Sequence, residues 1–181
     1  PAAPPLPPPQ ESLRELIPER AVLAGVVRKH ALEPLRELFT QDPALQQELS
    51  AYLRQSINVD LTELSGLVFF STSLAEPPRG AVILRLQGAE TAKLPLLSGS
   101  GSPEPLPPHL GVPLLRLDGE TVAAALPGAL VLGSADAVRE AIADHERLAG
   151  ALSPASPLGG LLSGDPRLTD VEVAVAARGV G

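Results

Sequence analysis

The three histidines of this chain, His30, His109 and His145, are the residues best suited to proton transfer near neutral pH and to binding a transition metal. No two of them stand three or four residues apart, the spacing that places two zinc ligands on one face of a helix. His30 and Glu33 form a lone i, i+3 pair at an expected helix start, and His145 falls on the expected buried side of its helix. We therefore predict no metal site, and the absence of cysteine excludes zinc-thiolate sites and cysteine nucleophiles.

Serine and lysine also stand outside the common catalytic motifs. The serines of SGSGSPE at 98–104 lack the strand-to-helix turn of a G-x-S-x-G nucleophile elbow. The two lysines, Lys29 and Lys93, are not in the G-x-x-x-x-G-K-[ST] pattern of a phosphate-binding loop. The sequence thus predicts neither a serine nucleophile nor a nucleotide site of these kinds.

Carboxylate pairs of the kind used in acid–base catalysis occur at Asp60 with Glu63 and at Asp165 with Asp170. Asp60 is explained more simply as a turn or helix start whose side chain caps the backbone. No segment is dense enough in oxygen ligands for calcium. The prediction is a non-catalytic chain without cofactor or metal, and the alternative is a divergent enzyme whose site no motif encodes.

The stretch ALVLGSADAVREAI, residues 129–142, has the strand, glycine and helix start from which phosphate cradles are built. It has only one glycine, Gly133, whereas a cradle uses several glycines and usually a cation. Asp136 in the first helical turn complements the helix dipole and would repel an anion. Ser134 is the expected N-cap. The stretch therefore predicts a structural strand-to-helix turn.

Composition excludes further classes of function. The chain has 181 residues, a formal net charge of −7 and 44% hydrophobic residues, but only three Phe, one Tyr and no Trp. Nucleic-acid binding needs clustered cations and stacking aromatic rings, so nucleic acid is not an expected partner. No run of about 20 apolar residues exists, so membrane attachment would depend on an anchor outside this chain.

The elements that position these residues follow from the hydrophobic periodicity. Strands are expected at 19–27, 67–72, 81–88, 112–117, 120–126 and 129–133 and in DVEVAVAAR at 170–178, and helices at 11–17, 30–40, 43–53, 135–148 and 157–163. The helix at 43–53 would begin with Asp42 as its cap and Pro43 at its first position. The Asp118-Gly119 and Pro127-Gly128 pairs indicate hairpins. This order predicts an α+β fold, with an antiparallel sheet of about six to seven strands and helices mainly on one face.

The chain has two proline-rich segments, one at its start and one in the middle. PAAPPLPPPQ at 1–10 is too rich in proline for a helix or sheet, and we expect a semi-rigid tether. The alternative, a ligand for a PxxP-binding groove, lacks the flanking basic residue. Residues 98–111 are expected to form a flexible surface loop rather than a domain boundary. The remainder, 11–181, is then a single domain, which could belong to a longer repeated protein.

Two segments resemble poorly characterised exported bacterial proteins of the DUF3352-like type: VDLTELSGLVFF at 59–70 and TVAAALPGALVLGSADAVREAI at 121–142. The resemblance spans about residues 19–150. It implies an extracytoplasmic and often lipid-anchored protein built from α+β units, without established catalysis. It carries over no catalytic residue.

These observations favour an exported, non-catalytic binding or scaffold domain that the proline-rich segment holds at the bacterial cell envelope. Its partner would be a protein or another envelope component. A carrier of an apolar ligand or lipid is the second hypothesis, because an aliphatic sheet under helices can enclose a cavity. The sequence leaves the oligomeric state open, although the last strand offers a route to self-association.

Overall fold

The computed structural model describes residues 17–28, 63–73, 79–86, 103–147 and 171–175, together with single residues at 31, 32, 37, 44, 47, 50, 51, 59, 158 and 162. The strands are β1 (Leu23–Arg28), β2 (Leu64–Ser73), β3 (Arg79–Leu86), β4 (Glu104–His109), β5 (Val112–Asp118), β6 (Thr121–Leu126), β7 (Ala129–Ser134) and β8 (Val171–Val175), and α3 is Ala135–Arg147.

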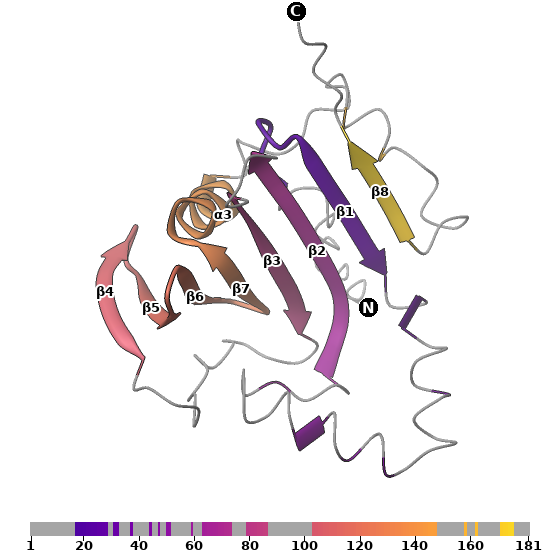
Figure 1. The fold of residues 1–181 in the computed structure, drawn as a ribbon, viewed down its shortest axis with the longest axis horizontal. Coiled ribbons are helices and arrows are strands. Elements are labelled where there is room, and N and C mark those ends of the chain that lie inside the picture. The colour runs from indigo at the N-terminus through magenta and orange to yellow at the C-terminus, as the bar shows by residue number, and fades with distance from the viewer. Residues whose placement is uncertain are drawn as a thin grey trace, which may run out of the picture.

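All eight strands belong to one sheet in the order β4-β5-β6-β7-β3-β2-β1-β8 (Figure 1). Every neighbouring pair is antiparallel, which confirms the predicted sheet type. The chain forms a meander from β4 to β7, and β7 then lies beside β3. β8 adds the other edge of the sheet by pairing with β1.

The predicted number of six to seven strands was too low, because the loop predicted over 98–111 is wrong for residues 104–109. This segment is the edge strand β4, in which Pro105 lies opposite Leu115 and Leu106 lies opposite Leu114. Proline lacks an N–H donor and is tolerated in a sheet mainly at an edge, where one side of the strand needs no partner. The short Leu110-Gly111 turn joins β4 to β5 with positive φ at both residues, 51° and 83°.

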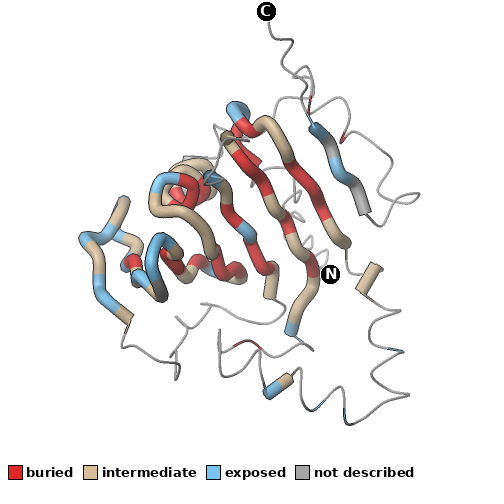
Figure 2. The backbone as a smooth tube through the Cα atoms, in the orientation of Figure 1, coloured by how far each residue is buried: buried red, intermediate tan, exposed pale blue. Residues whose placement is uncertain are grey.

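The hydrophobic core lies between the sheet and α3, on what we call the first face. Its largest sheet residues include Val26, Val68, Ile83, Leu114 and Val131, and α3 contributes Ala137, Val138, Ala141 and Ile142. Because α3 contacts β3, β6 and β7, it covers the middle of the sheet. Figure 2 shows the alternation of buried and less buried residues along these strands.

The other predicted helices fall mostly on residues that are not described. Helical conformation is recorded for Ala31, Leu32 and Glu37, for Ala44, Gln47, Ser50 and Ala51, and for Leu158. These residues agree with the helices expected at 30–40, 43–53 and 157–163. The helix expected at 11–17 lies outside the described residues up to position 16.

Candidate functional site

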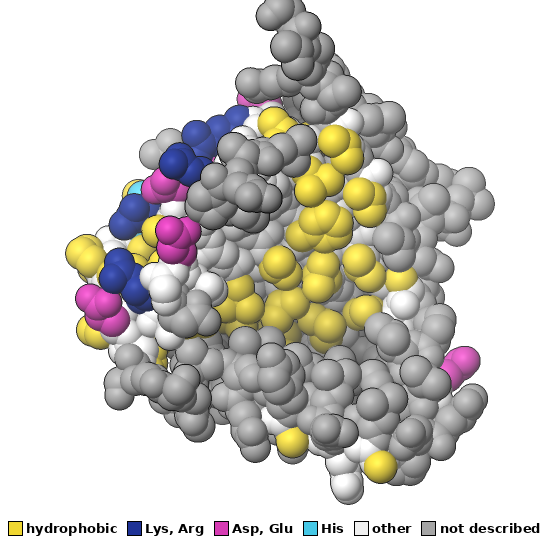
Figure 3. Space-filling model, in the orientation of Figure 1, with side chains coloured by type: hydrophobic (Ala, Val, Ile, Leu, Met, Phe, Trp, Pro, Cys, Tyr) yellow, Lys and Arg dark blue, Asp and Glu magenta, His cyan; other side chains and the backbone are white. Residues whose placement is uncertain are grey.

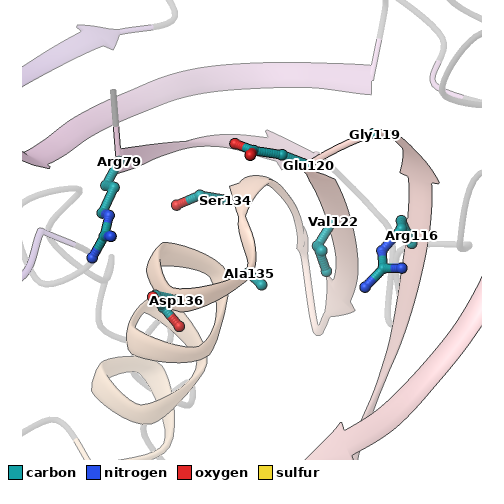
Figure 4. A pocket seen from close by; sticks show the side chains of 8 residues that line it. All are labelled: Arg79, Arg116, Gly119, Glu120, Val122, Ser134, Ala135 and Asp136. Carbon is teal, nitrogen blue, oxygen red and sulfur yellow. The ribbon is translucent and has the colours of Figure 1, made fainter. Parts of the chain in front are cut away.

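A polar pocket lies at the N-terminus of α3, beside the junction of β7 and α3 at Ser134 (Figure 4). Its volume is about 320 Å³. Arg79 comes from the start of β3, Arg116 from β5, Glu120 from the β5–β6 turn, and Ser134 and Asp136 from the junction of β7 and α3. Gly119, Val122 and Ala135 complete the lining.

A close approach of two backbones brings β3 and β7 together at this pocket. A Cβ atom at Gly133 would lie 2.3 Å from the carbonyl oxygen of Gly80 and 2.6 Å from Cα of Ala81. Such contacts are far below van der Waals distance, so only glycine fits here. This approach places Ser134, at the end of β7, in the same pocket lining as Arg79 of β3.

Ser134 and Asp136 lie at the start of α3, as predicted from the sequence, but the hydrogen bond expected from Ser134 is absent. Ser134 directly precedes α3, yet its Oγ is buried and has no hydrogen-bond partner, so the predicted capping hydrogen bond is not formed. Asp136 is in the first turn, as expected, and its Oδ1 lies 3.6 Å from Nη1 of Arg139. The other two predicted caps, Asp42 and Asp60, lie outside the described residues.

The charges around the pocket balance one another. Two cationic residues, Arg79 and Arg116, and two acidic residues, Glu120 and Asp136, line the same pocket. Arg116 is engaged by a further carboxylate, because its Nη1 donates to Oε2 of Glu104 at 3.0 Å. No ion pair within the described part of the chain involves Arg79. An anion in this pocket would meet two carboxylates as well as two cations, so the arrangement does not favour phosphate.

The pocket also lacks the partner that nucleophilic catalysis requires. A serine nucleophile needs a base within hydrogen-bond distance, and Oγ of Ser134 has none. The described histidines stand elsewhere: His109 ends β4, and His145 is on the third turn of α3. His30 is outside the described residues. Within the described ranges, no group of three or more His, Asp or Glu residues is placed to hold a metal ion.

The second face of the sheet is the more unusual surface. One row of residues in register crosses six strands of this face without a polar side chain; we call it the apolar row. It consists of Val173, Gly25, Phe69, Val82, Leu132 and Ala123. Val173 is 57% exposed and Val82 is 36% exposed, although Val82 is on a central strand. Figure 3 shows hydrophobic side chains gathered over β1, β2 and β3.

Within the apolar row, the side chain of Phe69 packs over the neighbouring strand. A Cβ atom at Gly25 would lie 2.2 Å from Cζ of Phe69, so the ring lies directly over the glycine of the neighbouring strand. An aromatic ring laid over a cross-strand glycine covers backbone that would otherwise be exposed. On the same face, Val59, Leu84 and Leu130 form a small buried cluster. On β1, β2 and β3 the described side chains of the second face are therefore apolar except for Ser71, and Val59 covers part of this face.

Sequence reasoning did not identify this surface, although a signal for it was present. In β3, both the inward residues Ala81 and Ile83 and the outward residues Val82 and Leu84 are apolar. A strand with one solvated face alternates between apolar and polar residues. The lack of alternation over residues 81–84 therefore indicates that the second face of β3 is apolar like the first.

Comparison of the chain with protein-family models, with curated proteins and with solved structures gives no match. Within the described residues, no helix is both long enough and apolar enough to span a membrane.

Proposed function

We propose that this chain is a non-catalytic, exported binding or scaffold domain held at the bacterial cell envelope. Its partner is a protein or another envelope component with a flat apolar surface. The observation that carries the proposal is the apolar row, in which Val82 is 36% exposed at the middle of an eight-stranded sheet. Soluble proteins seldom leave a contiguous apolar surface exposed unless it binds something.

The second face suits a macromolecule better than a small ligand. Its β1, β2 and β3 positions carry no ionisable side chain: Leu23, Gly25, Val27, Leu67, Phe69, Ser71, Gly80, Val82, Leu84 and Leu86. The one polar side chain among them, Ser71, donates its hydroxyl to backbone carbonyl oxygens of Ser73 and Arg79 at 2.6 and 3.0 Å. An apolar face with an exposed side chain such as Val82 matches the apolar centre of a protein interface, whereas a carrier holds its ligand in a cavity.

The arrangement of the rest of the chain follows from this proposal. α3 and the buried residues Leu158 and Leu162 belong to the core on the first face, and the proposal assigns the exposed part of the second face to the partner. The segment 1–10 is the tether, and contact with the membrane is made only by an anchor outside this chain. The acidic composition, with 21 Asp and Glu against 14 Lys and Arg, speaks against nucleic acid as the partner.

The test places a photo-crosslinking amino acid at position 82 of the full chain, expressed in its own cells. Position 136 is the matched control, because the side chain of Asp136 is 65% exposed and lies on α3. We expect one defined protein product from position 82 and none from position 136. Equal labelling from both positions, or crosslinks only between copies of this chain, would contradict the proposal. A lipid that co-purifies in stoichiometric amount and is lost in Val82→Asp would instead identify a carrier.

A further inference from the structure

The two edges of the sheet are built differently. β4, at one edge, has six residues, of which Pro105, Pro107 and Pro108 lack an N–H donor. Prolines and charges at an edge prevent another strand from pairing there. β8, at the other edge, reads VEVAV and contains neither proline nor glycine. Among the described strands its only neighbour is β1, so within the described part of the chain one edge of the sheet carries prolines and the other carries a strand with free backbone donors.

The β8 edge is also where the apolar row ends. Val173 lies opposite Gly25, and Val175 lies opposite Leu23. Their exposed fractions, 57% and 50%, are the two highest among the large hydrophobic strand side chains whose burial is described. A strand added beside β8 would cover these valines and continue the row.

We propose that β8 pairs antiparallel with β8 of a second copy of this chain, with Val173 opposite Val173 at the two-fold axis. This register pairs all five residues of β8: Val171 lies opposite Val175, and Glu172 lies opposite Ala174. No acidic residue then lies opposite another, which matters because like charges in direct opposition destabilise a strand pair.

Alternative registers are less favourable. A shift of one residue would turn the second face of one copy away from that of the other. A shift of two residues keeps the faces together but pairs only three of the five residues. In one of these shifts Glu172 lies opposite Glu172 of the second copy. The proposed register joins the two sheets and makes one apolar row out of two.

This pairing goes beyond the proposed function and does not depend on it, because it uses the edge of the sheet rather than the centre of the second face. The chain of 18.7 kDa is examined by light scattering coupled to size-exclusion chromatography over a range of concentrations. We expect the mass to rise toward twice this value with concentration. Val173→Lys places two lysines opposite each other and should weaken dimerisation by about tenfold. The matched control Val82→Lys, on the same face but far from the edge, should weaken it less than about twofold.

A second measurement uses the fact that the chain has no cysteine. Val173→Cys brings two thiols together at the two-fold axis, at the Cβ separation of a directly opposite pair. Val175→Cys does not, because position 175 lies opposite position 171. We expect oxidative crosslinking of Val173→Cys to be at least about tenfold faster than that of Val175→Cys. Both residues are exposed, so neither variant depends on repacking a core. A monomer at all concentrations, a stable Val173→Lys dimer, or faster crosslinking through position 175 would overturn the proposal.

Discussion

Gly25 and Phe69 provide the most direct test of how the second face is held together. In Gly25→Ala the new Cβ would lie 2.2 Å from Cζ and 2.4 Å from Cε1 of Phe69. Ordinary carbon contacts begin near 3.5 Å, so the ring must move by more than about 1 Å. Because the obstructing atoms are the far end of a side chain, the ring rather than the backbone is expected to give way.

The size of the effect follows from two opposing contributions. Overpacking of this kind costs about 1 to 3 kcal/mol. Replacing glycine by alanine inside a strand gains about 0.5 to 1 kcal/mol, because the unfolded chain loses conformational freedom. We therefore expect Gly25→Ala to lower the free energy of unfolding by about 1 to 2 kcal/mol.

The decisive comparison is the same substitution in a Phe69→Leu background. Without the ring over Gly25, the alanine should be accommodated and should stabilise the protein by about 0.5 kcal/mol. The sign of the effect thus reverses, with a coupling free energy of about 2 kcal/mol between the two positions. Urea unfolding followed by far-ultraviolet circular dichroism measures all four proteins of the cycle. For a slope near 2 kcal/mol per molar urea, Gly25→Ala shifts the midpoint by about 0.5 to 1 M. An equal loss in both backgrounds, or no loss in the wild type, would refute the reasoning.

Three further predictions concern the rest of the fold. Gly133→Ala should lower the free energy of unfolding, measured in urea, by about 3 kcal/mol. The new Cβ would lie 2.3 Å from the backbone oxygen of Gly80, and no side-chain movement can relieve that clash. A loss below about 1 kcal/mol would contradict this close approach. Leu110→Asn should stabilise the protein by about 1 kcal/mol and raise its melting temperature. The reason is that Leu110 has a φ of 51° and Asn-Gly is the preferred pair for such a turn. An unchanged or lower melting temperature would contradict this prediction. Arg20 forms an ion pair with Oε1 of Glu140, whose Oε2 is buried without a hydrogen-bond partner. Arg20→Gln should therefore lower the free energy of unfolding by about 1 kcal/mol, and Glu140→Gln should lower it by less. Equal losses in the two variants at low salt would show that burial of the carboxylate does not matter.

The local elements were predictable because their residues encode them directly. The Pro127-Gly128 hairpin follows from turn chemistry, and the helix after Ser134 follows from the helical spacing of Val138, Ala141 and Ile142, all of which are buried. Glu140 of the same helix shows what local sequence does not encode: its side chain is only 21% exposed and pairs with Arg20, which is far away in the sequence.

Features that depend on contacts between distant segments could not be obtained in this way. The prolines of β4 made this strand hard to predict. A strand tolerates proline when it lies at the edge of a sheet, and the sequence of one segment does not show where in the sheet it lies. The pairing of β3 with β7 brings Arg79 to Ser134 across more than fifty residues of sequence. The apolar row is likewise a property of register: each member is an ordinary strand residue, and only the alignment of six strands makes a surface of them.

The pairing of β1 with β8 determines how the domain would respond to mechanical load. Leu23, which begins β1, lies opposite Val175, which ends β8. The chain therefore enters β1 and leaves β8 at the same end of the strand pair. A force pulling the two flanking segments apart would open this pair from that end, one hydrogen-bonded step at a time, rather than shear the whole ladder at once. Such unzipping offers little resistance. A domain fixed at both ends would therefore yield first at β8, while the strands beneath α3 stayed folded.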